Sequence, residues 1–269
     1  MVLLAVFLTT FFQSLSFAQE SAPVARPPLQ IDLNEDLVLF PPYLVDFTGG
    51  SVLNVNSSSR HQKRSVVAKE WLEYGDEFKM IPSFAVQVWM HEHIQWVGGG
   101  VLDLTVGKSE WDRKSTPYLL ELRHGWMHVW VRTKGMRDEE RYVLKLKTPH
   151  TEFTIQDASF WISVKPDRTE VYMVTGQMKD SEGRSIFEKR YTRWNEKHEL
   201  AEVSRAWDPG ATEVNIAGLY PGLVALSGKA ESDWKSGKNQ TGYAELRKKG
   251  KQSADRFKPT KLTPFRAPE

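Results

Sequence analysis

Residues 122–133, LRHGWMHVWVRT, place two histidines and two tryptophans where they could form a metal or ligand site. His124 and His128 are four residues apart, a spacing that joins two metal ligands on a helix but separates them by about 13 Å on a strand. Trp126, His128 and Trp130 instead recur at every second position, which is the period of a strand. We therefore expect a strand with one aromatic face, and these three side chains are the candidate binding residues.

The alternate positions of this strand form a second, apolar set. Met127, Val129 and Val131 would share the opposite face, and we expect this face to lie in the core. Gly125 marks either the start of the strand or a bulge in it. On such a strand, His124 and His128 are too far apart to bind the same metal ion.

A second histidine pair lies in the segment HEHIQW. On a strand, His91 and His93 share a face about 7 Å apart, a separation that two metal ligands can span. No third ligand is near in the sequence, although His61 or His150 could complete a site through the fold. We expect a polar hairpin turn here, with a metal site as the alternative. The sequence predicts no metal and no cofactor.

Other patterns that could support catalysis are weak. Asp138, Glu139 and Glu140 lie in a charged segment that is typical of a solvated turn. No serine nucleophile of the G-x-S-x-G type and no phosphate-binding loop is present. The glycine run at 97–101 lacks a following helix and lysine, so we interpret it as a turn or bulge. The chain is therefore expected not to be an enzyme.

Composition limits the classes of function. The chain has no cysteine, so disulfides and thiolate chemistry are excluded. A hydrophobic content of 40% is ample for a packed core, and ten tryptophans favour a β-rich fold or a carbohydrate- or protein-binding surface. A net charge of +2 is too small to indicate a nucleic-acid partner.

The N-terminal segment differs from the rest. Residues 1–18 are apolar and end in Ser-Phe-Ala, which predicts a secretory signal peptide cleaved before Gln19; an uncleaved anchor is the alternative. Residues 19–42 are proline-rich and resemble an extended tether. We expect the mature protein in the periplasm or secreted, without a transmembrane segment.

From residue 43 to residue 205, short strand patterns recur between turn signals such as the Gly-Asp pair at Gly75 and the Pro-Asp pair at Pro166. This spacing predicts an all-β sandwich or roll of many short antiparallel strands, with disordered termini. The segment 193–207 has a poor apolar stripe, and we expect a short helix or a loop there.

The C-terminal region, 206–269, is expected to be an irregular segment followed by a basic tail. From Lys235 to Glu269 there are ten Lys or Arg and three Asp or Glu, a net charge of 10 − 3 = +7. Residues 247–269 contain few apolar side chains and bury too little apolar surface to order themselves. The tail is either a solvated end or an electrostatic contact with anionic lipid, cell-wall polymer or an acidic protein.

Three segments in order resemble the FecR-type periplasmic domain of bacterial proteins. These are LEYGDEFKMIPSFAVQVWM (72–90), LLELRHGWMHVWV (119–131) and YVLKLKTPHTEFTIQDASFWISVKPDRTEVYMVTGQMKD (142–180). The resemblance covers about half of the chain, from about Phe47 to Met178.

Individual positions carry this resemblance. Thr148 and Pro149 match the Thr-Pro pair of the family, Phe160 its buried aromatic residue and Gly176 the glycine before its last strand. The family's Gly-Thr pair is replaced by Asp-Ala at positions 157–158, so the turn at this point is expected to differ.

The resemblance implies an all-β periplasmic module. In sigma-regulator members, this module follows a cytoplasmic segment and a membrane span, and it responds to an outer-membrane receptor. No such segment precedes the signal-like run here, so the chain is expected to be closer to exported, stand-alone members.

Taken together, these observations predict a non-enzymatic exported envelope protein, a binding or scaffold module that acts through protein–protein or cell-wall contacts. The alternatives are a periplasmic signalling regulator that contacts an outer-membrane receptor and an exported wall-glycan hydrolase. A hydrolase would gather polar residues in a pocket, whereas a binding module would expose an aromatic strip or an open sheet edge. Candidates for the strip, most of them expected in the core, are Trp89, Trp96, Trp111, Trp126, Trp130 and Trp161.

Overall fold

The computed structural model describes residues 41–51, 53–57, 62–108, 118–132, 143–204 and 209–256. In chain order the strands are β1 (Tyr43–Thr48), β2 (Leu53–Ser57), β3 (Gln62–Val66), β4 (Glu70–Trp71), β5 (Asp76–Met80), β6 (Ala85–His91), β7 (Ile94–Lys108), β8 (Tyr118–Arg132), β9 (Leu144–Lys147), β10 (Glu152–Lys165), β11 (Arg168–Asp180), β12 (Ser185–Phe187), β13 (Tyr191–Asn195) and β14 (Leu200–Ser204). The helices are α1 (Pro209–Leu219), α2 (Pro221–Lys235) and α3 (Lys238–Arg256).

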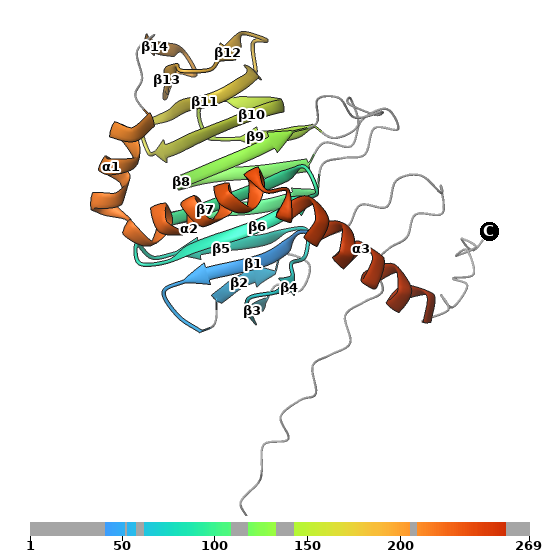
Figure 1. Ribbon diagram of the computed structural model, residues 1–269. Coiled ribbons are helices and arrows are strands. Elements are labelled where there is room, and N and C mark those ends of the chain that lie inside the picture. Colours follow the sequence, from blue (N-terminus) through green and yellow to red (C-terminus); the bar gives the residue numbers. More distant parts are fainter. Residues whose placement is uncertain are drawn as a thin grey trace, which may run out of the picture.

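The strands form one continuous sheet that folds over into two layers (Figure 1). The first layer runs β4, β1, β6, the start of β7, the end of β8, the end of β10, the start of β11, β13 and β14. The second runs β3, β2, β5, the end of β7, the start of β8, β9, the start of β10, the end of β11 and β12. The β-rich fold that the sequence predicts is therefore confirmed.

Four long strands, β7, β8, β10 and β11, belong to both layers because each bends midway. The bends coincide with register shifts, and three of them carry a glycine with positive φ: Gly100 (+75°), Gly125 (+109°) and Gly176 (+78°). A Cβ on Gly125 would lie 2.5 Å from the carbonyl oxygen of Val101. Strands that change sheet in this way make the corners of a two-layer β fold.

These bends settle three expectations about glycine. Gly125 is a bulge inside β8 rather than the start of a strand. Residues 97–101 are the bulged part of β7, so the bulge interpretation is confirmed and the turn interpretation is wrong. Gly176 lies within β11 rather than before a separate last strand.

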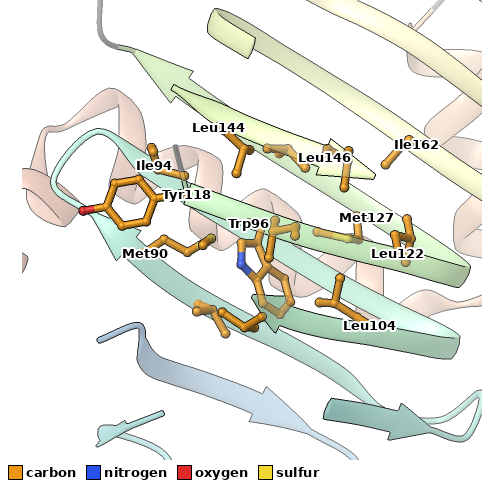
Figure 2. Packing of buried hydrophobic residues seen from close by; sticks show 14 of the residues in the cluster. Met90, Ile94, Trp96, Leu104, Tyr118, Leu122, Met127, Leu144, Leu146 and Ile162 are labelled. Carbon is orange, nitrogen blue, oxygen red and sulfur yellow. The ribbon is translucent and has the colours of Figure 1, made fainter. Parts of the chain in front are cut away.

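The main core lies between the two layers and is almost entirely apolar (Figure 2). Met127 and Val129 are fully buried in it and Val131 is 2% exposed, as the alternation in the sequence predicts. Trp96 packs edge-to-face on Phe78, with 5.8 Å between ring centroids. Each fully buried side chain of this size contributes about 1.5–3 kcal/mol, so this core is the main source of stability.

Three expected turns are confirmed. Gly75 (φ +91°) immediately precedes β5, and the Pro166–Asp167 pair joins β10 to β11. The segment around Glu92 joins β6 to β7 as a hairpin, as expected for HEHIQW.

The expectation of a short helix or loop at 193–207 is wrong for residues 193–204, which lie in β13, a turn and β14. Thr192 and Trp194 are buried at alternate positions, and Trp194 packs edge-to-face on Phe153 with 5.0 Å between centroids. The side-chain oxygen of Asn195 accepts hydrogen bonds from the backbone N–H groups of Lys197 and Glu199, which closes the turn. The period is therefore two, not 3.6.

The expectation of an irregular segment at 206–269 is wrong for residues 209–256, which form α1, α2 and α3. In α2 the buried residues Leu223, Leu226, Ala230 and Trp234 make a stripe three or four residues apart, and this stripe packs on the first layer. Helix α2 crosses the face of that layer, and α3 continues past its side (Figure 1). Tertiary contacts here override a polar composition.

Several predictions fall on residues that the structure does not describe. These are the signal peptide and most of the tether at 1–40, His61, Trp111, the carboxylates at 138–140 and the last part of the basic tail at 257–269. Within the described ranges, no helix has the length and apolar character needed to cross a membrane.

Candidate functional site

The three predicted binding residues lie on the outer face of the first layer, in the second half of β8. Helix α2 covers them, and His128 and Trp130 are each only 2% exposed. Trp126 is half-buried and stacks on Tyr172, with 6.0 Å between ring centroids and 21° between planes. The aromatic face therefore exists, but it is an interface with the protein's own helix. The binding role of these residues stays a prediction.

His128 is the centre of this interface. Its ring is stacked between Trp130 and Trp161, at centroid distances of 3.8 and 4.3 Å. Its Nδ1 lies 2.7 Å from the hydroxyl of Ser227 on α2, and its Nε2 lies 3.2 Å from the hydroxyl of Ser159. Burial lowers the pKa of His128 well below its ordinary value, so the ring is neutral. One ring nitrogen then donates and the other accepts, which hydroxyls can match either way.

A serine beside a histidine could serve in nucleophilic catalysis, but this arrangement lacks what that chemistry needs. Ser227 is 3% exposed, so no substrate reaches it while α2 is in place. The second ring nitrogen of His128 meets Ser159 rather than a carboxylate that would stabilise an imidazolium. The pair therefore connects a helix to a sheet in this arrangement.

A second polar contact joins α2 to the sheet beside His128. The side-chain amide of Gln95 donates to the carbonyl oxygen of Ala230 at 2.8 Å, and its oxygen accepts from the indole N–H of Trp89 at 3.2 Å. Gln95 is fully buried. Sequence reasoning missed this residue, although a glutamine that shares the strand face of apolar neighbours is a signal for a buried partner.

The two histidines of the β6–β7 hairpin do lie together. His91 and His93 have ring centroids 5.5 Å apart, and the backbone N–H of His93 donates to Nδ1 of His91 at 3.3 Å. Burial, followed by the charges of His93 and Arg247, lowers the pKa of His91 to about 3. Among the residues that the structure describes, no group of three or more His, Cys, Asp or Glu side chains could hold a metal ion.

His150, one possible third ligand, has other partners. Its Nδ1 lies 2.9 Å from the hydroxyl of Thr169, and its Nε2 lies 3.2 Å from the carbonyl oxygen of Pro166. The Thr169 hydroxyl in turn donates to that of Thr148 at 3.1 Å, and Thr148 donates to the carbonyl oxygen of Thr151 at 2.8 Å. The Thr148–Pro149 motif thus anchors the start of β10 through buried polar contacts.

The outer face of the second layer has a different character. Arg123 lies at its centre, with its guanidinium 2.9 Å from Asp103, 3.7 Å from Glu77 and 3.7 Å from Glu121. These side chains are about one-third exposed, and they alternate with core residues along their strands. This face is polar and mixed in charge, as expected for a solvated sheet.

The second layer ends on β3, which pairs with β2 alone among the described strands. Gln62, Lys63 and Ser65 on this strand are exposed. Arg64 reaches inward to the buried carboxylate of Asp76, whose pKa is nevertheless raised because burial outweighs the arginine. Unpaired backbone groups on an edge strand can accept another strand, and the charges on β3 discourage indiscriminate pairing.

Comparisons with known proteins give a limited likeness. No family model matches the chain, and no curated protein matches it. Two crystal structures of a candidate anti-sigma factor from Parabacteroides distasonis are similar to it, at 16% and 15% sequence identity and TM-scores of 0.42 and 0.31. The similarity covers 52% and 53% of this chain and 64% and 61% of those chains, so less than two thirds of their length is matched.

Proposed function

We propose that this protein is a non-catalytic exported module of the bacterial cell envelope that binds a partner protein through the edge of its sheet. The observation that carries the proposal is β3, an edge strand with an exposed, charged surface at the end of the second layer. A partner strand can add to such an edge through backbone hydrogen bonds, and side chains then supply specificity.

The edge of the sheet is preferred as the binding surface because the aromatic face is covered. A strip of tryptophans is the usual alternative for binding, but α2 covers His128 and Trp130. His128 and Gln95, which are buried beneath α2, bond to the helix rather than converge on an open site. A hydrolase would need such an open site with an accessible acid or nucleophile.

The sequence supplies the cellular context of the proposal. The apolar run at 1–18 favours export, and the three segments that resemble the FecR-type domain favour a periplasmic module. We propose on this basis that the protein acts in the periplasm or outside the cell, with an envelope protein as its partner.

A photo-crosslinking experiment in the native host tests the proposal. A photoreactive residue replaces Ser65, which is exposed on β3, and in a matched variant it replaces Lys147, which is exposed on the inner strand β9. We expect a discrete crosslinked product from position 65 and none from position 147. Equal products from both positions, or none from either, would contradict binding at the edge.

A second result would contradict the non-catalytic assignment. The purified mature protein is incubated with wall glycan, and the release of reducing ends is measured. Turnover that a single polar substitution abolishes, without loss of folding, would show that the protein is an enzyme.

A further inference from the structure

Helices α2 and α3 together form a connected unit on the outer face of the first layer, and we call this unit the latch (Pro221–Arg256). It begins at a break in the helical chain. Tyr220 has φ −138° and ψ 69°, outside the helical region, and Pro221 follows it at the first helical position. Because proline disfavours a helical residue before it, the break is fixed by the sequence and can serve as a hinge.

The attachment of the latch combines the apolar stripe of α2 with a set of polar contacts. Besides the bonds of His128 and Gln95 to α2, the side chain of Asn239 donates to the carbonyl oxygen of Glu92 at 3.0 Å. Tyr243 donates to the carbonyl oxygen of Met90 at 3.0 Å. Water can replace every one of these bonds when the latch leaves.

Two ion pairs tie the latch to the sheet at its margins, Lys229 to Asp46 and Arg247 to the Glu92 side chain. Both are partly exposed, and exposed ion pairs contribute little to stability. They therefore orient the latch more than they hold it.

The closed latch also leaves polar atoms without partners. Gln87, on the face of β6 that the helices cover, is fully buried, and neither its amide nitrogen nor its amide oxygen has a hydrogen-bond partner. The side-chain oxygen of Asn239 on α3 is also buried without a hydrogen-bond partner. Opening would return these groups to water, which lowers the free energy needed to open.

The core between the layers differs in its composition and its connections, although the indole N–H groups of Trp96 and Trp194 there also have no hydrogen-bond partner. It is apolar, and the four strands that cross from one layer to the other tie both sides together. We propose that the latch detaches from the first layer as a unit while both β layers stay folded, and that this opening uncovers Trp126, His128 and Trp130. The inference goes beyond the proposed edge-strand function, because it concerns a different face.

A thiol-labelling experiment tests the opening, and the absence of native cysteine makes a single introduced cysteine unique. Val97 lies under α2, whereas Val129 on the neighbouring strand faces the core between the layers, and both are fully buried. In the full chain, V97C and V129C are labelled under native conditions, and each rate is divided by its rate in denaturant. We expect V97C to be labelled about tenfold faster or more, because it needs only the local opening.

Two glycines of the latch provide a matched pair of variants. A Cβ on Gly242 would lie 2.9 Å from the indole ring of Trp89, whereas a Cβ on Gly228 would meet nothing within 4 Å. Both changes raise the helix propensity of the latch, but only Gly242→Ala disturbs its contact with the sheet. We expect Gly242→Ala to speed labelling of V97C and to leave V129C nearly unchanged, while Gly228→Ala speeds neither.

Equal normalised rates for V97C and V129C would overturn the proposal, since both sites would then be exposed by the same global unfolding. Equal acceleration of both by Gly242→Ala would overturn it as well. Hydrogen exchange of the unsubstituted chain gives a second measurement, which does not depend on whether the variants fold. Faster exchange of the α2 and α3 amides than of the β8 and β10 amides supports the latch, and exchange at one common rate refutes it.

Discussion

Gly176 and Gly183 have almost the same backbone conformation, with φ of +78° and +77°, but different surroundings. A Cβ on Gly176 would lie 2.1 Å from the carbonyl oxygen of Asp157, whereas a Cβ on Gly183 would meet nothing within 4 Å. Gly183→Ala should therefore cost only the backbone strain of about 1–2 kcal/mol. Gly176→Ala should cost clearly more, because the bend of β11 must also move.

Urea unfolding of the two glycine variants measures this difference in the free energy of unfolding. Equal losses would mean that the close approach of β11 to Asp157 does not limit the bend.

Val129 and Trp126 lie on opposite faces of the same strand. Val129 is fully buried between the two apolar layers, so Val129→Asp would bury a carboxylate without a partner. We expect a loss of several kcal/mol and unfolding of the β layers. Trp126 is half-buried and stacks only at the margin of the α2 interface, so Trp126→Ala should cost less and leave the fold intact.

Thermal melts of these two variants test the assignment of the two faces. If both substitutions lower the melting temperature equally, the assignment is wrong.

At the scale of elements, the contacts of the latch are sensitive to acid. His128 faces the hydroxyls of Ser159 and Ser227 and the rings of Trp130 and Trp161, and burial lowers its pKa. The buried His91 on the sheet beside α3 has a pKa of about 3, because of burial, His93 and Arg247.

Both histidines regain an ordinary pKa of about 6.5 when they are exposed, so the unfolded or open state binds more protons below that pH. The contribution of His91 is complete above about pH 6.5 and is lost as the pH falls toward about 3, and that of His128 is lost in the same direction. The slope is at most about 1.4 kcal/mol per pH unit for each histidine.

Denaturant unfolding between pH 7 and pH 5 measures this slope. His128→Gln should flatten it by one histidine's share. A slope that is unaltered by His128→Gln would show that this ring does not link folding to protons.

Sequence patterns predicted some elements and missed others for physical reasons. Aromatic side chains and small or flexible apolar side chains alternate without a break over residues 126–131, so the strand and its core face were predictable. Helix α2 was missed because its apolar stripe is short and interrupted by Ser227, whose hydroxyl has a partner only in the folded protein. The prediction of an aromatic face was correct. That Trp130 on this face is covered depends on α2, so its burial could not be inferred.

At the scale of the whole molecule, the basic C-terminal region divides at the end of its contacts with the sheet. Leu246 packs against the cluster around Trp89, and Arg247 pairs with Glu92. Deleting 252–269 keeps both contacts, so the melting temperature should change by no more than about 1–2 °C. Deleting 245–269 removes both and should lower it by several degrees.

The same two deletions separate folding from the role of the charge. Each removes basic residues, so each should weaken association with envelope fractions at low salt, and added salt should abolish the difference from the full chain. Thermal melts and sedimentation with envelope fractions provide the two measurements. A deletion of 252–269 that unfolds the protein would contradict the division.

The four strands that bend from one layer into the other join the two layers of this sandwich through continuous backbone. Sheets that are joined only by loops can slide or peel apart under shear, but here any sliding would have to drag the backbone of β7, β8, β10 and β11 around its bends. A one-residue insertion in β8 would likewise exchange the inward and outward side chains beyond it and displace its register. Insertions and deletions are thus restricted to the connecting segments. The two layers unfold together, and for the same reason they must evolve together.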